Sequence, residues 1–193
     1  MEKAADNAMI SFLQRFGKLP EDVTTAIQRN TVQQELPRKT LLLRAGRVCD
    51  HLYFLEKGLA RNYSENGEKT YTNDIVVDGE LLASFASFVS RLPSEENIEL
   101  LEDSKLYSLH YDQLQQLYAE YPYLERIGRL IAERNYISLA SQTYRLRFLN
   151  SAERYENLIT RKPEIIKRTP IGVIASYLGM SIETLSRIRG KEV

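Results

Sequence analysis

The spacing of apolar residues changes twice along the chain. Residues 8–16 and the stretch from Leu19 to Asn30 carry apolar side chains at helical spacing. From Thr31 to Leu109 short apolar runs recur about every 8–12 residues, broken by glycines and by the strong turn pair Asn66-Gly67. From Tyr111 onward helical spacing returns. The pattern predicts N-terminal helices, an all-β barrel or double-sheet jelly roll, and a helical C-terminal part.

The C-terminal part begins with an uninterrupted helical stretch. Residues 111–121 begin a helix that Pro122 interrupts, and residues 122–149 contain no further proline. At ~1.5 Å per residue, a helix over that stretch is roughly 40 Å long. Arg134, Asn135 and Ser138 break any regular heptad. A further helix is predicted over residues 151–160, followed by a basic connection over residues 161–169.

Residues 169–190 predict two short helices with a tight turn between them. Thr169 and Pro170 suit a helix start, and Gly179 suits the turn because glycine readily adopts positive φ. Ser181 is a second N-cap, and Leu185 and Ile188 recur on one face of the helix that follows. Two helices so joined predict a helix-turn-helix, whose second helix enters the DNA major groove.

The second helix has side chains that suit base recognition. Ile182, Glu183, Ser186 and Arg187 lie on or near the face opposite Leu185, and arginine and glutamate can bind guanine and cytosine edges. Ser181 and Thr184 are placed to hold a phosphate at the helix start. Lys167 and Arg168, in the basic connection, are also placed to contact phosphate, with a solvated linker as the alternative.

The charge distribution agrees with a DNA partner for one end only. The chain has no net charge, but residues 1–125 hold 13 Lys and Arg against 20 Asp and Glu, a net charge of −7. Residues 126–193 hold 13 against 6, a net charge of +7. The basic part contains the predicted helix-turn-helix, so double-stranded DNA is the expected partner.

The recognition helix also carries a family pattern. Gly179, Ser181, Glu183, Thr184, Leu185, Ser186 and Arg187 match a motif that resembles the Crp-Fnr family of bacterial transcription regulators, in its Bacteroidetes-type branch. Residues 45–61 resemble the cyclic-nucleotide-binding barrel of that family. The resemblance implies an α+β chain with a barrel domain over residues 1–121, a dimerisation helix over 122–149 and a DNA-binding domain over 150–193. It also implies a homodimer.

In that family the ligand pocket combines a Gly-Glu-Leu segment with a downstream arginine. Gly79, Glu80 and Leu81 match the first part, but Ser94 falls at the arginine position and Glu95 at the following hydroxyl position. Since a partly buried phosphate needs a paired charge or several donors, cyclic nucleotide binding is not expected. Another small-molecule effector remains possible, and so does a barrel with a structural role only.

Two other classes of protein compete with a DNA-binding regulator. A ligand-sensing or protein-interaction module would lack DNA binding. An enzyme is not expected, because the chain contains no nucleophile elbow, P-loop or dinucleotide fingerprint. Cys49, His51 and His110 are too few for an iron–sulfur cluster or a predicted metal site. No apolar run is long enough for a membrane helix and no secretion signal is found, so a cytoplasmic location is expected.

Overall fold

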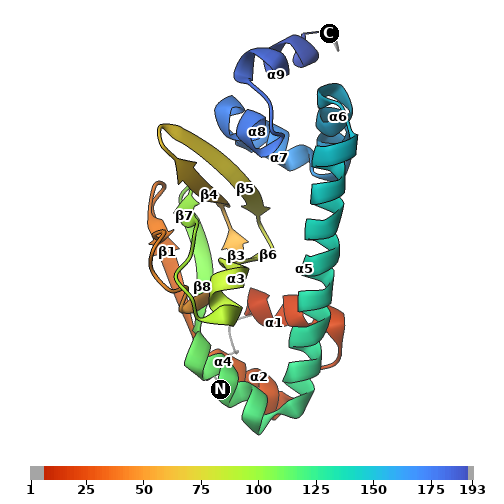
Figure 1. The fold of residues 1–193 in the computed structure, drawn as a ribbon. Coiled ribbons are helices and arrows are strands. Elements are labelled where there is room, and N and C mark those ends of the chain that lie inside the picture. Colours follow the sequence, from red (N-terminus) through yellow and green to blue (C-terminus); the bar gives the residue numbers. More distant parts are fainter. Residues whose placement is uncertain (1–6, 191–193) are drawn as a thin grey trace.

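The computed structural model describes residues 7–190 (Figure 1). Residues 1–6, on which the prediction of no secretion signal largely depends, lie outside the described residues. The first helices are α1 (Ala8–Leu13), the 3₁₀ helix η1 (Gln14–Phe16) and α2 (Glu21–Asn30). The strands are β1 (Thr31–Leu36), β2 (Leu41–Leu43), β3 (His51–Lys57), β4 (Leu59–Asn66), β5 (Lys69–Val77), β6 (Glu80–Leu82), β7 (Asn97–Leu100) and β8 (Ser104–His110). The fold class is confirmed for the jelly-roll-like barrel and the long helix.

The strands form two antiparallel four-stranded sheets. Their orders are β1-β8-β3-β6 and β2-β7-β4-β5. Between the sheets lies an apolar cluster that includes Leu55, Ile98, Leu100 and Leu106, all fully buried. The hairpin predicted at Asn66-Gly67 joins β4 and β5, with Gly67 at φ 62°. These contacts make the barrel a self-contained core that can support side chains at its open end.

One irregularity interrupts the pairing of β4 with β5. Asn62 pairs with Asp74, but the next residue, Tyr63, pairs with Thr72, so Asn73 has no partner across the hairpin. Such a bulge places two consecutive side chains on the same side of a sheet. It therefore brings Asn73 and Asp74 together at the end of the barrel.

Helices connect and flank the barrel. The short helix α3 (Phe85–Ser90) lies between β6 and β7, and α4 (Tyr111–Glu120) follows β8. Helix α5 (Pro122–Phe148) begins with proline at its first position, as predicted, and runs alongside the barrel (Figure 1). Its start packs with α1, α2 and α4 around Val23, Leu117, Leu124 and Ile127.

The middle of α5 is open to solvent. Every residue from Glu133 to Ala140 is exposed, on all sides of the helix. The exposed residues include Tyr136, Ile137 and Leu139, with exposed fractions of 73%, 64% and 63%. Neither the barrel nor the C-terminal helices cover this stretch.

The remaining helices form a separate layer at the far end of α5. They are α6 (Ser151–Arg161), α7 (Pro163–Arg168), α8 (Ile171–Tyr177) and α9 (Ile182–Arg189). Their apolar cluster, which includes Leu158, Ile165, Ile174 and Leu185, continues into Leu59, Ile75 and Val77 of the barrel. The C-terminal helices are thus docked on the outer face of the β4–β5 sheet.

Two local predictions in this region were wrong. The basic connection over residues 161–169 is largely helical, because it forms α7 with Pro163 at its first position and Ile165 fully buried. Thr169 does not cap α8: the helix begins at Ile171 and no side chain caps its start. The Thr169 hydroxyl is buried without a hydrogen-bond partner.

Candidate functional site

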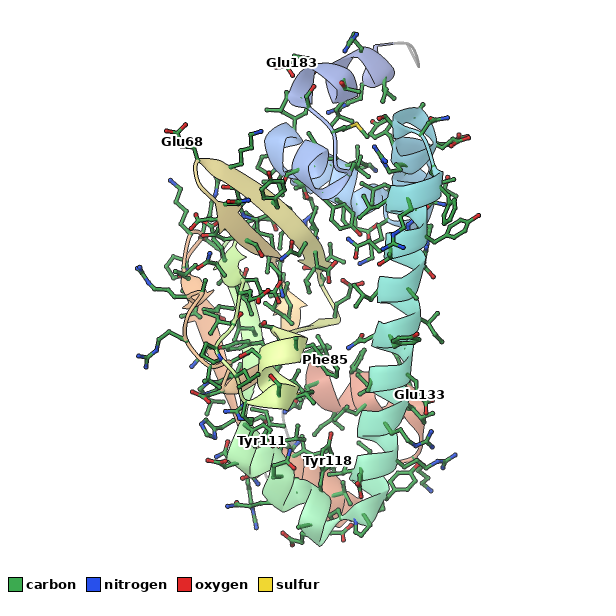
Figure 2. All side chains as sticks on the ribbon, viewed as in Figure 1. Glu68, Phe85, Tyr111, Tyr118, Glu133 and Glu183 are labelled. Carbon is green, nitrogen blue, oxygen red and sulfur yellow. The ribbon has the colours of Figure 1, made fainter. Side chains whose placement is uncertain are left out.

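The start of α9 is well formed and open to solvent. The Ser181 hydroxyl accepts a hydrogen bond from the Thr184 N–H at 3.2 Å, as predicted for an N-cap. Ser181, Ile182, Glu183, Ser186 and Arg187 are exposed, and Thr184 is half-buried. Figure 2 shows Glu183 at the end of the molecule that lies farthest from α2. All six residues predicted for this helix therefore share one accessible region.

The opposite side of α9 is fixed in the core. Leu185 has an exposed fraction of 0%, and Ile188 packs against the same cluster. The turn before α9 is closed by Gly179 at φ 63°, with hydrogen bonds from Gly179 N–H to Ser176 and from Met180 N–H to Ala175. This pair of bonds satisfies the last carbonyl groups of α8. The polar face of α9 consequently has one defined orientation.

Electrostatics at α9 favour an ionised Glu183. A hydrogen bond from its own backbone N–H and one from Ser181 lower the pKa of Glu183 below its usual value. The Arg187 guanidinium stays exposed, and its Nε lies 3.4 Å from the Glu183 carbonyl oxygen. A carboxylate and a guanidinium are thus both presented to solvent on consecutive turns.

The two cations predicted to contact phosphate have different environments. Lys167 is exposed, in keeping with its predicted role. The Arg168 guanidinium is instead bound to the barrel: it contacts Asp78 and Glu102, each at 2.6 Å, and donates to the Gly58 carbonyl at 2.8 Å. In this arrangement Arg168 is not available to a phosphate, because two carboxylates already hold it.

This group of residues, the Arg168 cluster, affects the ionisation of its members. Burial acts to raise the pKa of Asp78, but hydrogen bonds from Arg168 and from the Gly58 N–H outweigh burial and lower it. Lys162, at the other end of α7, pairs with Glu80 at 2.8 Å. Both ends of α7 are therefore held by the segment between β5 and β6.

The residues predicted for the ligand pocket have different environments. Gly79 takes φ 79° in the turn before β6, and the carboxylate of Glu80 binds Lys162 and accepts from the Val77 N–H. Leu81 packs against the cluster formed with the N-terminal helices. Ser94 is buried and Glu95 is exposed. No hydrogen bond joins Glu80 to Ser94 among the described residues.

A different set of polar side chains meets at the end of the barrel. Asn62 donates to Glu96 Oε1 at 3.1 Å and Asn73 donates to Glu96 Oε2 at 2.9 Å. Ser94 Oγ lies 2.9 Å from Ser84 Oγ, donates to the Glu96 carbonyl at 2.8 Å and accepts from the Glu96 N–H. We call these residues and Asp74 the barrel mouth. Their hydrogen-bond partners within the described chain include no cation.

Sequence reasoning missed most of the barrel mouth. Ser94 is the member that the sequence pattern pointed to, whereas Asn62, Asn73, Asp74, Ser84 and Glu96 were not identified as parts of a site. They converge because of the bulge in β5, which no local sequence signal predicts. Ser84 could have been found as the residue preceding a short helix, where serine is common.

Metal binding finds no support in this structure. No group of three or more His, Cys, Asp or Glu side chains able to hold a metal ion occurs within residues 7–190. The Cys49 thiol is buried, and burial raises its pKa. The rings of His51 and His110 lie edge to face, 5.1 Å apart. None of the helices in the described part of the chain is apolar enough over a sufficient length to cross a bilayer.

The barrel is similar in sequence to a known domain family. The family model described as the cyclic nucleotide-binding domain matches residues 33–121. The match covers 89 of the 193 residues, less than half of the chain. It runs from β1 to the end of α4, so the family's fold accounts for both sheets and for α3. No curated protein sequence matches the chain.

Solved structures extend the similarity from the cyclic nucleotide-binding domain to the whole chain. A c-di-GMP-responsive global regulator, CLP of Xanthomonas campestris, is 19% identical, with a TM-score of 0.65 over 89% of this chain and 91% of CLP. FixK2 of Bradyrhizobium japonicum is 14% identical, with a TM-score of 0.71 over 83% of each chain. A Crp/Fnr-family regulator of Eubacterium rectale is 18% identical, with a TM-score of 0.68 over 88% of this chain and 82% of its own. The chain has the fold of Crp/Fnr transcription regulators.

Proposed function

We propose that this protein is a sequence-specific DNA-binding transcription regulator in which α8 and α9 form the helix-turn-helix. The observation that carries the proposal is the polar face of α9, which is exposed over Ser181, Glu183, Ser186 and Arg187 while Leu185 is fully buried. A helix held in this way can enter the major groove without any rearrangement of its own core. The net charge of +7 over residues 126–193 supports the same partner.

The protein acts as a homodimer through α5 in this proposal. Leu130, Ile137 and Tyr144 recur at seven-residue intervals, and Phe148 follows Tyr144 by one turn with ring centroids 4.7 Å apart. Because residues 133–140 are all exposed, a second copy of α5 is the partner that fits this row. The exposure of this row thus supports a dimer interface that the irregular heptad pattern alone did not indicate.

The barrel is proposed to act without a cyclic nucleotide. The family's ligand carries a phosphate, which requires a paired cation or several donors. At the corresponding turn Ser94 is buried and bonded to Ser84 and to the Glu96 backbone, and the Glu96 carboxylate lies in the same turn. The residues present therefore do not suit a cyclic phosphate.

Selection of duplexes from a random-sequence library tests the DNA-binding proposal. Once a bound duplex is known, fluorescence anisotropy over a salt titration measures affinity and its salt dependence. Arg187→Ala should relax base preference at one position in each half-site, at a cost of about 1–3 kcal/mol. Lys167→Ala should weaken binding to all duplexes and lower the salt slope by roughly one.

The control is Arg29→Ala, an exposed arginine in α2 at the opposite end of the molecule (Figure 1). It should leave affinity and salt slope unchanged. If no duplex is enriched at low salt, the protein is a ligand-sensing or interaction module rather than a DNA-binding regulator.

Sedimentation velocity tests the dimer. Ile137→Glu places a charge in the middle of the proposed seam and should give a monomer with unchanged secondary structure, since Ile137 contacts nothing within the chain that it would disturb. Val32→Glu, at an equally exposed apolar position on the barrel, is the control and should remain a dimer. A dimeric Ile137→Glu would place the seam elsewhere.

A further inference from the structure

We propose that the barrel mouth binds a small organic cation, with Asn62, Asp74 and Glu96 accepting hydrogen bonds from its ammonium or guanidinium group. This inference rests on the proposed function, because it assumes that the barrel of a transcription regulator acts as its sensor. The proposal follows from the side chains that meet at this end of the barrel. They are hydrogen-bond acceptors, whereas the phosphate of a cyclic nucleotide would need hydrogen-bond donors there.

Asn62 provides the first observation. Only 6% of the residue is exposed, and its Oδ1 is buried without a hydrogen-bond partner. The orientation of the amide is fixed, because its Nδ2 donates both to the Ala83 carbonyl and to Glu96 Oε1. A flipped amide would direct an oxygen at two acceptors. The unpaired atom is therefore an acceptor, and a ligand that offers an N–H or O–H can satisfy it.

Asp74 provides the second observation. It pairs with Asn62 across β4 and β5, and the bulge directs Asp74 to the same side as Asn73. Its side chain is accessible to solvent, and within the described chain its carboxylate accepts one hydrogen bond, from the Ile75 N–H next to it. The other carboxylate oxygen has no hydrogen-bond partner among the described residues, and Glu96 is one of the charges that act on this carboxylate.

Two carboxylates and one cation act on Asp74. Glu80 and Glu96 disfavour its ionised form, and Lys162, which is bound to Glu80, favours it; the cations Arg145 and Arg161 act on the neighbouring Tyr177. Protein surrounds Asp74 on several sides, and this desolvation, opposed by Lys162 and reinforced by Glu80 and Glu96, raises the pKa of Asp74 to about 6. Tyr177 of α8 also faces Asp74; burial and then Asp74 raise its pKa to about 12. A bound cation would relieve the repulsion among the carboxylates.

The same chemistry separates an organic cation from other ligands. Asn62, Asp74 and Glu96 do not form part of any three-residue group suited to a metal ion among residues 7–190. An anionic ligand would meet the Glu96 carboxylate, whose oxygens already hold the amides of Asn62 and Asn73. A compact ligand with several N–H donors matches both the charge and the unpaired acceptor.

Isothermal titration of the full-length protein at neutral pH tests the proposal, with putrescine and agmatine as probes. The neutral isostere 1,4-butanediol and cyclic AMP are the comparison ligands. Both amines should bind, and at about tenfold above its Kd each should raise Tm by about 3–6 °C. The same titration at pH 6 should show proton release and hence a heat that depends on the buffer, because a nearby cation lowers the pKa of Asp74 from about 6. The diol and cyclic AMP should produce no shift.

Isosteric variants connect the binding to the barrel mouth. Asp74→Asn and Glu96→Gln should each weaken amine binding by at least about tenfold, the loss expected for a charge-assisted hydrogen bond. Glu68→Gln is the matched control, because Glu68 is exposed at the tip of the β4–β5 hairpin, away from the mouth (Figure 2). It should bind as tightly as the parent. The Tm of each ligand-free variant shows that it is folded.

Three results would overturn the proposal. Neither amine binds, or both Asp74→Asn and Glu96→Gln bind the amines as tightly as the parent protein does, or cyclic AMP binds more tightly than putrescine. None of them would alter the DNA affinity of the parent protein, which is measured separately. Conversely, a protein that binds putrescine but selects no duplex would refute the DNA-binding proposal and leave this inference standing.

Discussion

Replacing Arg168 with alanine tests how the C-terminal helices are held on the barrel. The guanidinium bonds two carboxylates and one backbone carbonyl, and a quarter of its side chain is exposed. Hydrogen bonds to charged groups contribute about 1.5–3 kcal/mol when enclosed, and exposed ion pairs contribute about 0–1 kcal/mol. Because the Arg168 cluster is partly exposed, we expect Arg168→Ala to lower the free energy of unfolding by about 2 kcal/mol, which corresponds to a Tm lower by roughly 4–8 °C.

Salt and pH distinguish this loss from a packing effect. Urea titrations at about 0.1 M and about 1 M NaCl should show a smaller difference between Arg168→Ala and the parent at high salt, because exposed charges are screened. Since Arg168 helps to lower the pKa of Asp78, its contribution is present above the usual carboxylate range and is lost as pH falls through the folded pKa of Asp78. The difference should therefore fade in acid.

The reasoning is refuted if Arg168→Ala leaves stability unchanged but lowers the salt slope of DNA binding. That outcome would show that Arg168 leaves the barrel and contacts phosphate, as the sequence alone predicted. Arg168→Lys is the control for charge: it keeps one ion pair and loses the forked geometry, so its stability should fall between those of the parent and the alanine variant.

Three further predictions concern single positions. Because the pKa of Asp74 is raised, the contribution of this residue to stability is present below the usual carboxylate range and is lost as pH rises through about 6. The Asp74→Asn variant should not show this loss. Its urea midpoint should therefore exceed that of the parent by more at pH 8 than at pH 5. Gly179→Ala should cost about 1–2 kcal/mol, measured by urea unfolding, because alanine is strained at φ 63°. Cys49 should react with a thiol reagent in the native protein far more slowly than in urea, since burial raises its pKa; equal rates would contradict its placement.

Helix α9 could be predicted well from sequence because its signals are local. Ser181, Gly179 and Leu185 occupy neighbouring positions, and cap, turn and buried face each depend on a few adjacent residues. The strand-rich barrel and the proline at the start of α5 were predicted for the same reason. These features require no knowledge of distant parts of the chain.

Other features of the site depend on contacts between distant segments. Lys167 and Arg168 are indistinguishable as neighbouring cations, yet the carboxylates that hold Arg168 lie 90 and 66 residues away in sequence. Glu80 matched a family motif, but Lys162 engages it from 82 residues away. The barrel mouth depends on a bulge at Asn73, which sequence periodicity does not reveal. Partners of this kind are known only once the chain is folded.

The turn at Gly79 has a mechanical consequence. Asp78 and Glu80, on either side of it, hold opposite ends of α7 through Arg168 and Lys162. A helix fixed at both ends to one hairpin cannot pivot independently of it. Any change in the pitch of the C-terminal helices relative to the barrel must either carry this turn along or break both ion pairs together. Because the apolar contacts between these helices and the β4–β5 sheet would be lost at the same time, an all-or-none transition is expected rather than a gradual one.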